Sequence, residues 1–136
     1  MIAKRLKTHT HTPLVFIFLF SLPSLVSATP PEIVAARVTC LSEKECTASI
    51  TLRHSDTGWE HYANRWDIFS PKGELLGTRI LRHPHVEEQP FTRTLEKFKI
   101  PQVLQEVTIV AFDTGGAQSA PFRVNVRWDK SLLPLQ

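Results

Sequence analysis

Histidines are the residues of this chain best suited to chemistry, and two of them form an H-x-H pair. His83 and His85 lie in a polar, proline-bounded connection that runs from Leu81 to Phe91. Residues two apart in an extended backbone point to the same side, and Pro84 favours an extended conformation at His83. The pair therefore offers two imidazole nitrogens on one side of a loop.

Imidazole nitrogens are preferred ligands of zinc and copper, whereas calcium and magnesium prefer oxygen ligands. Other histidines and a carboxylate or a water molecule can complete such a site. The sequence thus predicts a candidate zinc or copper site, with ligands drawn from His83, His85, His61, His54 and Glu87. The alternative is that the histidine pair and Glu87 lie on a hydrated loop surface, and that His54 closes the core end of a strand.

A second group of residues is typical of an interaction surface. Aromatic and arginine side chains supply large contact areas and bidentate hydrogen bonds. The predicted surface comprises Trp59, Tyr62, Arg82 and Phe91. Trp59 follows Gly58, so the alternative for it is to fold back over the core. From this group we predict a small module that binds a protein or another envelope component; a structural domain without a ligand is the competing hypothesis.

Known catalytic motifs are absent from the sequence. It contains no G-x-S-x-G elbow, P-loop, H-E-x-x-H motif or glycine-rich dinucleotide fingerprint. Ser55 and Asp56 follow His54, but adjacent residues on an extended chain point to opposite sides, so a hydrolytic relay is not expected. We therefore expect a binding protein rather than an enzyme, with metal-assisted catalysis as the remaining enzymatic route.

The N-terminal segment has the features of a secretory signal peptide. Basic residues precede an apolar stretch from Leu14 to Leu22, and Val26 and Ala28 occupy the small-residue positions of a cleavage site. The stretch is shorter than the roughly 20 residues of a membrane span. We expect residues 1–28 to be removed, leaving residues 29–136 as one domain with a short irregular C-terminal tail. The mature chain is then periplasmic or secreted and has no membrane span.

The basic character of the chain belongs to this leader. The whole chain has 16 basic and 13 acidic residues and a formal net charge of +3. The leader contains three of the basic residues and none of the acidic ones, so the mature chain is balanced at 13 of each. A nucleic-acid partner requires a net or clustered positive field and is therefore not expected.

Cys40 and Cys46 are expected to form a disulfide, because exported proteins are normally oxidised. The runs on both sides of a short polar link alternate so that both cysteines lie on the core face, together with residues such as Val34 and Val38. The C-x5-C spacing differs from the C-x-x-C of thioredoxin-like proteins. A structural hairpin disulfide is therefore preferred over a redox pair.

The rest of the chain predicts an all-β fold. Short β-branched and aromatic runs are bounded by Gly, Pro, Asn, Asp and Ser, and no segment sustains a 3.6-residue period. The seven expected strands are Ile33 to Cys40, Cys46 to His54, Asn64 to Ser70, Glu74 to Arg82, Phe91 to Phe98, Glu106 to Asp113 and Ala120 to Trp128. Strands of this number and spacing favour an antiparallel two-sheet sandwich.

Three features carry a resemblance to a known architecture, and the first is the spacing of the expected strands. Trp66 is in phase with Ile68 on the third expected strand, and the run V-T-I-V-A-F-D is followed by a glycine-containing turn. From Ile33 to Trp128 the chain resembles seven-stranded antiparallel immunoglobulin-like sandwiches. The sixth strand lacks a cysteine, so fibronectin-III-like and other small exported bacterial sandwiches, many of unknown function, are the nearer analogues. The resemblance implies a binding role and no particular chemistry.

Strand alternation also predicts which loops lie together. If successive strands run in opposite directions, the connections at residues 54–63, 83–90 and 114–119 share one end of the sandwich. The four histidines of the mature chain then gather at that end, beside Glu60, Glu87, Glu88 and Asp113.

Overall fold

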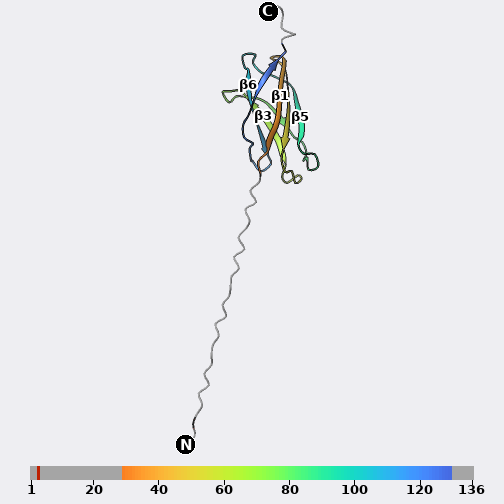
Figure 1. Ribbon diagram of the computed structural model, residues 1–136, viewed down its shortest axis with the longest axis vertical. Coiled ribbons are helices and arrows are strands. Elements are labelled where there is room, and N and C mark those ends of the chain that lie inside the picture. Colours follow the sequence, from red (N-terminus) through yellow and green to blue (C-terminus); the bar gives the residue numbers. More distant parts are fainter. Residues whose placement is uncertain (1–2, 4–28, 130–136) are drawn as a thin grey trace, which may run out of the picture.

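Seven β-strands form the computed structural model, which describes residues 3 and 29–129 (Figure 1). They are β1 (Glu32–Ser42), β2 (Glu45–Arg53), β3 (Ala63–Phe69), β4 (Leu75–Ile80), β5 (Phe91–Phe98), β6 (Glu106–Asp113) and β7 (Phe122–Trp128). All seven expected strands are present, and their ends agree with the expectation to within two residues. The expected leader and the tail from residue 130 lie outside the described residues.

The strands form one mixed sheet in the order β4-β3-β6-β7-β1-β2-β5. Neighbouring strands are antiparallel except β1 and β7, which run parallel where Val38 to Cys40 pair with Val126 to Trp128. The expected pair of purely antiparallel sheets is therefore wrong. All seven strands belong to one sheet, because the first and last strands lie side by side and run in the same direction. The immunoglobulin-like assignment stays a prediction.

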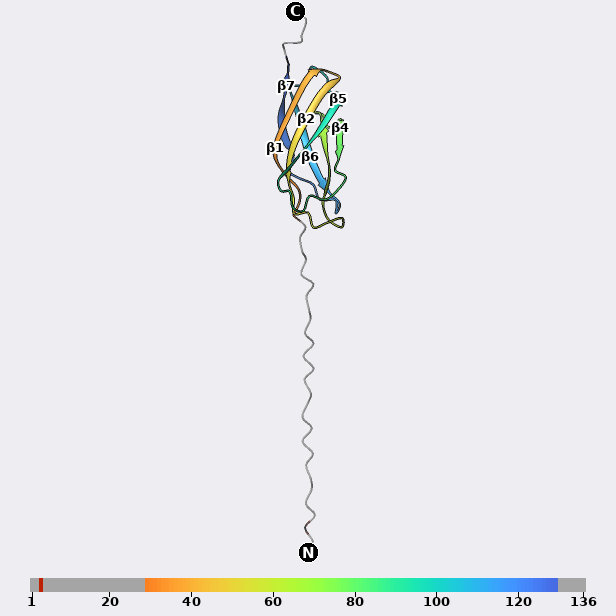
Figure 2. The ribbon, with the colours of Figure 1, turned by 90° about the vertical axis from the view of Figure 1, so that its right-hand side faces the viewer.

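The sheet curls until its two edge strands, β4 and β5, face each other, which makes it nearly barrel-shaped (Figure 2). Gly77 of β4 permits this approach. A Cβ atom at Gly77 would lie 2.9 Å from a methyl carbon of Leu95 and 3.3 Å from the ring of Phe98, both on β5. Glycine at this position therefore lets the edges meet through side-chain packing.

The core lies inside the curled sheet and follows the period-2 alternation of the strands. Its fully buried members include Val38, Ile50, Leu52, Trp66, Ile68, Val107 and Ile109. Trp66 and Ile68 are on the core face, as their phase predicts. The expectation for Val34 is wrong, because a register shift between Ile33 and Ala35 turns Ile33 inward and leaves Val34 39% exposed.

The predicted disulfide between Cys40 and Cys46 is confirmed. The two cysteines are direct partners in the β1–β2 ladder, and both are fully buried. Disulfides persist in oxidising compartments and are rare in the cytosol. The bond therefore agrees with an exported protein.

Three loops are joined at one end of the sheet. The His54 backbone N–H donates to Gln89 Oε1 at 3.0 Å, which ties the loop after β2 to the loop before β5. The Thr114 N–H donates to the Tyr62 carbonyl at 3.0 Å, which ties the loop after β6 to the first. This end of the molecule thus holds the histidines together. No helix in the described part of the chain is long and apolar enough to cross a membrane.

Candidate metal centre

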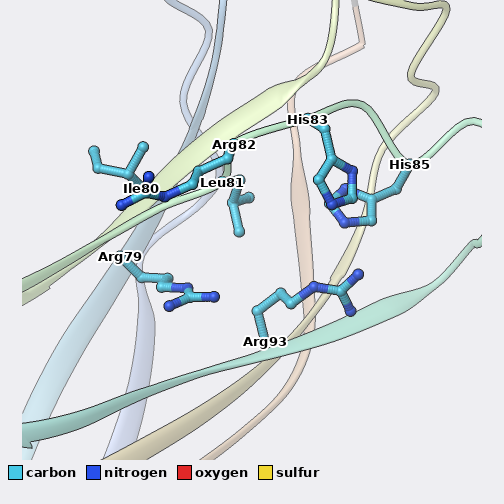
Figure 3. A pocket seen from close by; sticks show the side chains of 7 residues that line it. All are labelled: Arg79, Ile80, Leu81, Arg82, His83, His85 and Arg93. Carbon is cyan, nitrogen blue, oxygen red and sulfur yellow. The ribbon is translucent and has the colours of Figure 1, made fainter.

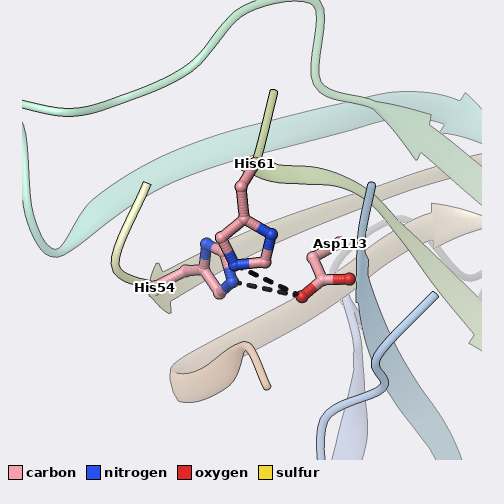
Figure 4. Close-up of side chains that lie close together, drawn as sticks. All are labelled: His54, His61 and Asp113. Atoms are coloured by element: carbon pink, nitrogen blue, oxygen red, sulfur yellow. Dashed lines mark ion pairs between the residues drawn. The ribbon is translucent and has the colours of Figure 1, made fainter. Parts of the chain in front are cut away.

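Three side chains converge at this end of the sheet (Figure 4). His54 directly follows β2, His61 lies in the loop before β3, and Asp113 is the last residue of β6. One potential ligand atom from each lies within 4.8 Å of the others. Segments distant in sequence therefore supply two imidazoles and one carboxylate to a single point.

The spacing of these atoms suits a metal ion. Asp113 Oδ2 lies 3.4 Å from His54 Nε2 and 3.8 Å from His61 Nε2. Two ligands with zinc bonds of about 2.0–2.1 Å in a tetrahedral arrangement are about 3.3 Å apart. Small side-chain adjustments would bring the three atoms to bonding distance from one ion.

Backbone amides hold the carboxylate of Asp113 in place. Its Oδ1 accepts hydrogen bonds from the N–H groups of Gly115 and Ala117, each at 2.9 Å. The turn that presents these amides places Gly116 at φ 85°, a conformation that glycine adopts without strain. Because Oδ1 is occupied, Oδ2 is the oxygen available to the histidines.

Asp56 fixes the ring of His54. Asp56 Oδ1 lies 2.6 Å from His54 Nδ1 and also accepts the Ala63 N–H at 2.9 Å. Both the His54 and the Asp56 side chains are fully buried. A carboxylate that accepts one imidazole N–H orients the ring and leaves the other nitrogen free to bind a metal. Here that nitrogen is Nε2, which faces Asp113.

A short turn presents His61. The Thr57 N–H donates to the His61 carbonyl at 2.9 Å, and the His61 N–H donates to Gly58, whose φ is 142°. The His61 side chain is 25% exposed, in contrast to His54 and Asp113, which are fully buried. The centre is therefore closed toward the core and open on the side of His61.

The two facing atoms of the centre favour a positive group between them. His54 Nε2 and Asp113 Oδ2 are buried and have no hydrogen-bond partner among the described residues. In the tautomer that donates from Nδ1 to Asp56, both atoms are acceptors that face each other across 3.4 Å. A buried polar atom without a partner is unfavourable by roughly 1–3 kcal/mol. A cation bound between the two atoms removes this penalty.

The structure divides the predicted ligand set. His54 and His61 lie together with Asp113, whereas His83 and His85 form a separate pair with ring centroids 4.5 Å apart. Asp56 stands between the two groups, since its Oδ2 accepts the His85 backbone N–H at 2.7 Å. His83 is exposed on the surface, and so is Glu87. Neither belongs to the cluster of ligand atoms around Asp113.

The predicted interaction surface is also divided. Trp59 is 69% exposed and packs edge to face on Tyr62 with centroids 5.8 Å apart, so it does not cover the core. Arg82 is exposed as well. Phe91 is not a surface residue, because it is 2% exposed and stacks on His85. Contact between Trp59 or Tyr62 and an envelope partner stays a prediction.

Sequence reasoning did not assign roles to Asp56 and Asp113. An H-x-D spacing places His54 and Asp56 on the same side of an extended segment, and this signal could have identified the pair. Asp113 ends a buried strand and precedes Thr114-Gly115-Gly116, which is typical of a turn in which an Asp side chain accepts backbone N–H groups. These two patterns identify single residues but not their convergence.

Comparison with known proteins gives limited similarity. No family model matches the chain. A protein from Halomicrobium mukohataei described as "Putative lipoprotein" is 41% identical over 54 residues, which are 40% of this chain and 26% of that protein. The superoxide reductase (neelaredoxin) from Ignicoccus hospitalis has a TM-score of 0.43 and 11% identity, over 74% of this chain and 81% of that one.

The superoxide reductase corrects one expectation. The absence of known motifs led us to expect a binding protein and no enzyme, whereas the structural neighbour is described as a superoxide reductase, which is an enzyme. The likeness is too weak to assign an activity, and the chemistry of this chain rests on its own residues.

Proposed function

We propose that this chain is an exported metal-binding domain that holds one divalent transition-metal ion with His54, His61 and Asp113. The observation that carries the proposal is the buried pair of His54 Nε2 and Asp113 Oδ2 at 3.4 Å, neither of which has a hydrogen-bond partner among the residues that the structure describes. Asp56 and the amides after Asp113 hold these two atoms toward each other without satisfying them. A bound cation would contact both atoms and so satisfy them.

The donor set indicates the class of metal. Two imidazole nitrogens and one carboxylate oxygen suit zinc or copper, and the same set with open positions also binds iron(II). Calcium and magnesium prefer sites built from oxygen ligands. Zinc is the first choice, because the 3.4 Å between His54 Nε2 and Asp113 Oδ2 is close to the ligand separation of a tetrahedral zinc site.

Three protein ligands leave room for a further ligand. Structural zinc sites are closed by four protein ligands, whereas sites that react or exchange ligands have three and an open position. A further ligand would enter from the side of His61, whose side chain is 25% exposed. Water or a small solute can therefore reach the metal without unfolding the domain.

Export is supported by three independent features. The first 28 residues have the pattern of a signal peptide, Cys40 and Cys46 form a buried disulfide, and the partial relative from Halomicrobium mukohataei is described as a lipoprotein. The proposal places the mature domain outside the cytoplasm, in a compartment where disulfides persist.

Metal analysis of the untagged, exported protein tests the proposal. After removal of adventitious metal with EDTA, titration with zinc, copper(II) and iron(II) by calorimetry should give one site for at least one of them. His54→Ala, His61→Ala and Asp113→Asn should each weaken binding by about tenfold or more. His83→Ala is the matched control, because it removes an exposed imidazole outside the cluster.

The control also discriminates between the two histidine groups. Unchanged affinity in His83→Ala together with loss in His61→Ala supports the centre at Asp113. Loss in His83→Ala with no change in His61→Ala would assign the metal to the His83–His85 pair instead. No stoichiometric binding of any of the three metals would rule out the proposed function.

A further inference from the structure

A positively charged cavity lies between the facing edge strands, apart from the metal centre (Figure 3). Its volume is about 120 Å³. Arg79 approaches from β4, Arg93 approaches from β5, and the loop after β4 contributes Arg82 and the His83–His85 pair. The two edge strands share no hydrogen-bonded ladder, so side chains line the space between them.

The charges around this cavity are unbalanced. Arg93 donates to Glu88 at 3.0 and 3.4 Å, which neutralises one guanidinium group. Arg79 and Arg82 have no acidic partner among the described residues, and Arg79 Nε is buried without a hydrogen-bond acceptor. Three cations and one carboxylate therefore leave two positive charges that no acidic group in the described part of the chain compensates.

His85 provides a buried polar group beside these charges. Its side chain is 2% exposed and lies between Phe91, with ring centroids 3.8 Å apart, and His83, with centroids 4.5 Å apart. Both ring nitrogens are buried and lack a hydrogen-bond partner among the described residues. Burial, Arg93 and His83 lower the pKa of His85, so a neutral ring offers one N–H donor. The contacts with Phe91 and His83 fix the ring of His85, which is one of the side chains that line the cavity.

From these groups we propose that the cavity binds a phosphate group, held by Arg79, Arg93 and the N–H of His85. Arginine forks bind phosphate through charge-assisted, often bidentate hydrogen bonds. A dianionic phosphate supplies acceptors for the buried Arg79 Nε and for His85, and it balances the two uncompensated charges. A cavity of about 120 Å³ admits a phosphate group and excludes folded segments of a protein partner.

Titration with inorganic phosphate at constant ionic strength tests this proposal. Proton–nitrogen NMR of the EDTA-treated full mature chain should show saturable shifts of the His85 imidazole and the Arg79 Nε resonances. Acetate, which has a single negative charge, should bind more weakly. EDTA removes any metal that could bind phosphate itself, and His61→Ala should keep phosphate affinity because His61 does not line the cavity.

Two substitutions at the cavity have opposite expected effects. Arg79→Gln should weaken phosphate binding by about tenfold or more, since it removes a charged donor with a buried nitrogen. Glu88→Gln should strengthen binding, because it releases Arg93 from its carboxylate partner. Arg127→Gln is the matched control: it removes the same charge from an exposed residue on β7, away from the cavity.

The outcomes separate a built site from general charge attraction. An equal loss in Arg79→Gln and Arg127→Gln would show that binding follows net charge and would overturn the proposal. The proposal would also be overturned if neither inorganic phosphate nor vesicles containing phosphatidic acid gave saturable shifts. Vesicles containing phosphatidic acid form a second arm: saturation by inorganic phosphate assigns a free anion, and saturation by the vesicles alone assigns a lipid headgroup.

Discussion

His54 and Asp56, two residues apart, form a buried pair in which Nδ1 and Oδ1 are 2.6 Å from each other. The pair does more than fill the end of β2. Asp56 also accepts the backbone N–H groups of Ala63 and His85, so one carboxylate joins the end of β2, the start of β3 and the loop before β5. The orientation of His54 is thereby coupled to the position of both neighbouring loops.

Asp56→Asn should weaken zinc binding without removing a ligand. An asparagine keeps one oxygen acceptor for the backbone amides, but it loses the negative charge that favours the metal-binding tautomer of His54. Carboxylates that orient a ligating histidine typically contribute 10–100-fold to metal affinity, and we expect a loss in that range by calorimetry. Asp67→Asn is the control, because Asp67 is a buried carboxylate that bonds Arg65 and Thr78 instead. Equal affinities in the two variants would contradict a positioning role for Asp56.

Asp113→Asn tests whether the Asp113 carboxylate faces a metal ion or a protonated histidine. The amide oxygen should take the place of Oδ1, which accepts two backbone N–H groups, so the amide nitrogen should replace Oδ2 and donate to His54 Nε2. The metal-free variant should then be at least as stable in urea as the metal-free wild type, because a donor faces an acceptor. Zinc should stabilise the wild type and leave the variant unchanged. A large loss of stability in the metal-free variant would indicate that Asp113 pairs with a protonated histidine.

Much of the fold follows from local patterns in the sequence. Alternation places Trp66 and Ile68 in the core, and the paired runs around Cys40 and Cys46 predict the hairpin with its disulfide. The parallel pairing of β1 with β7 could not be predicted, because it joins the two ends of the chain and has no local signature. The outward turn of Val34 depends on a register shift, which alternation alone does not reveal.

The site was less predictable than the fold. Alternating strand directions bring the histidine-bearing loops to one end, but they do not say which side chains meet there. The H-x-H spacing predicted that His83 and His85 are metal ligands. In the structure His83 is exposed, and the ring of His85 is stacked on Phe91. His61 and Asp113 are 52 residues apart. The pairing of Ala63 with Asp113 in the β3–β6 ladder and the hydrogen bonds of Thr114 with Glu60 and Tyr62 bring them together. Such loop-to-loop contacts leave no periodic pattern.

Reduction of the Cys40–Cys46 disulfide should lower the free energy of unfolding by about 2 kcal/mol, the value for closing so short a ring in the chain-entropy model. Urea unfolding of the mature chain with and without a reductant measures the difference. The double variant Cys40→Ala, Cys46→Ala is the control, since the reductant should not affect it.

Intact-mass analysis of the exported protein should give a chain that begins at Thr29 with both thiols oxidised. A retained leader or two free thiols would contradict the proposed export.

The environment of His85 predicts how the stability of the metal-free protein depends on pH. Burial is the largest cause that lowers the pKa of His85, followed by the charges of Arg93 and His83, while Glu88 and Asp56 act in the opposite direction. The folded pKa therefore lies below the unfolded value of 6.5. Between the two values the unfolded chain binds more protons, so the free energy of unfolding rises with pH. On acidification from about pH 7.5, the contribution of His85 should lower the free energy of unfolding. This decrease becomes progressively larger once the pH falls below about 6.5.

His85→Phe isolates this contribution. A phenyl ring can keep the stacking on Phe91, and the backbone N–H of residue 85 still reaches Asp56, but the side chain no longer titrates. Urea unfolding in EDTA between about pH 5.5 and pH 7.5 should show a smaller loss of stability on acidification in the variant than in the wild type. Glu88 does not interfere, because the hydrogen bond from Arg93 lowers its pKa from 4.5, below this window. The exposed His83→Phe serves as the control and should keep most of the wild-type slope. Equal slopes in wild type and His85→Phe would show that His85 is not held neutral by its surroundings.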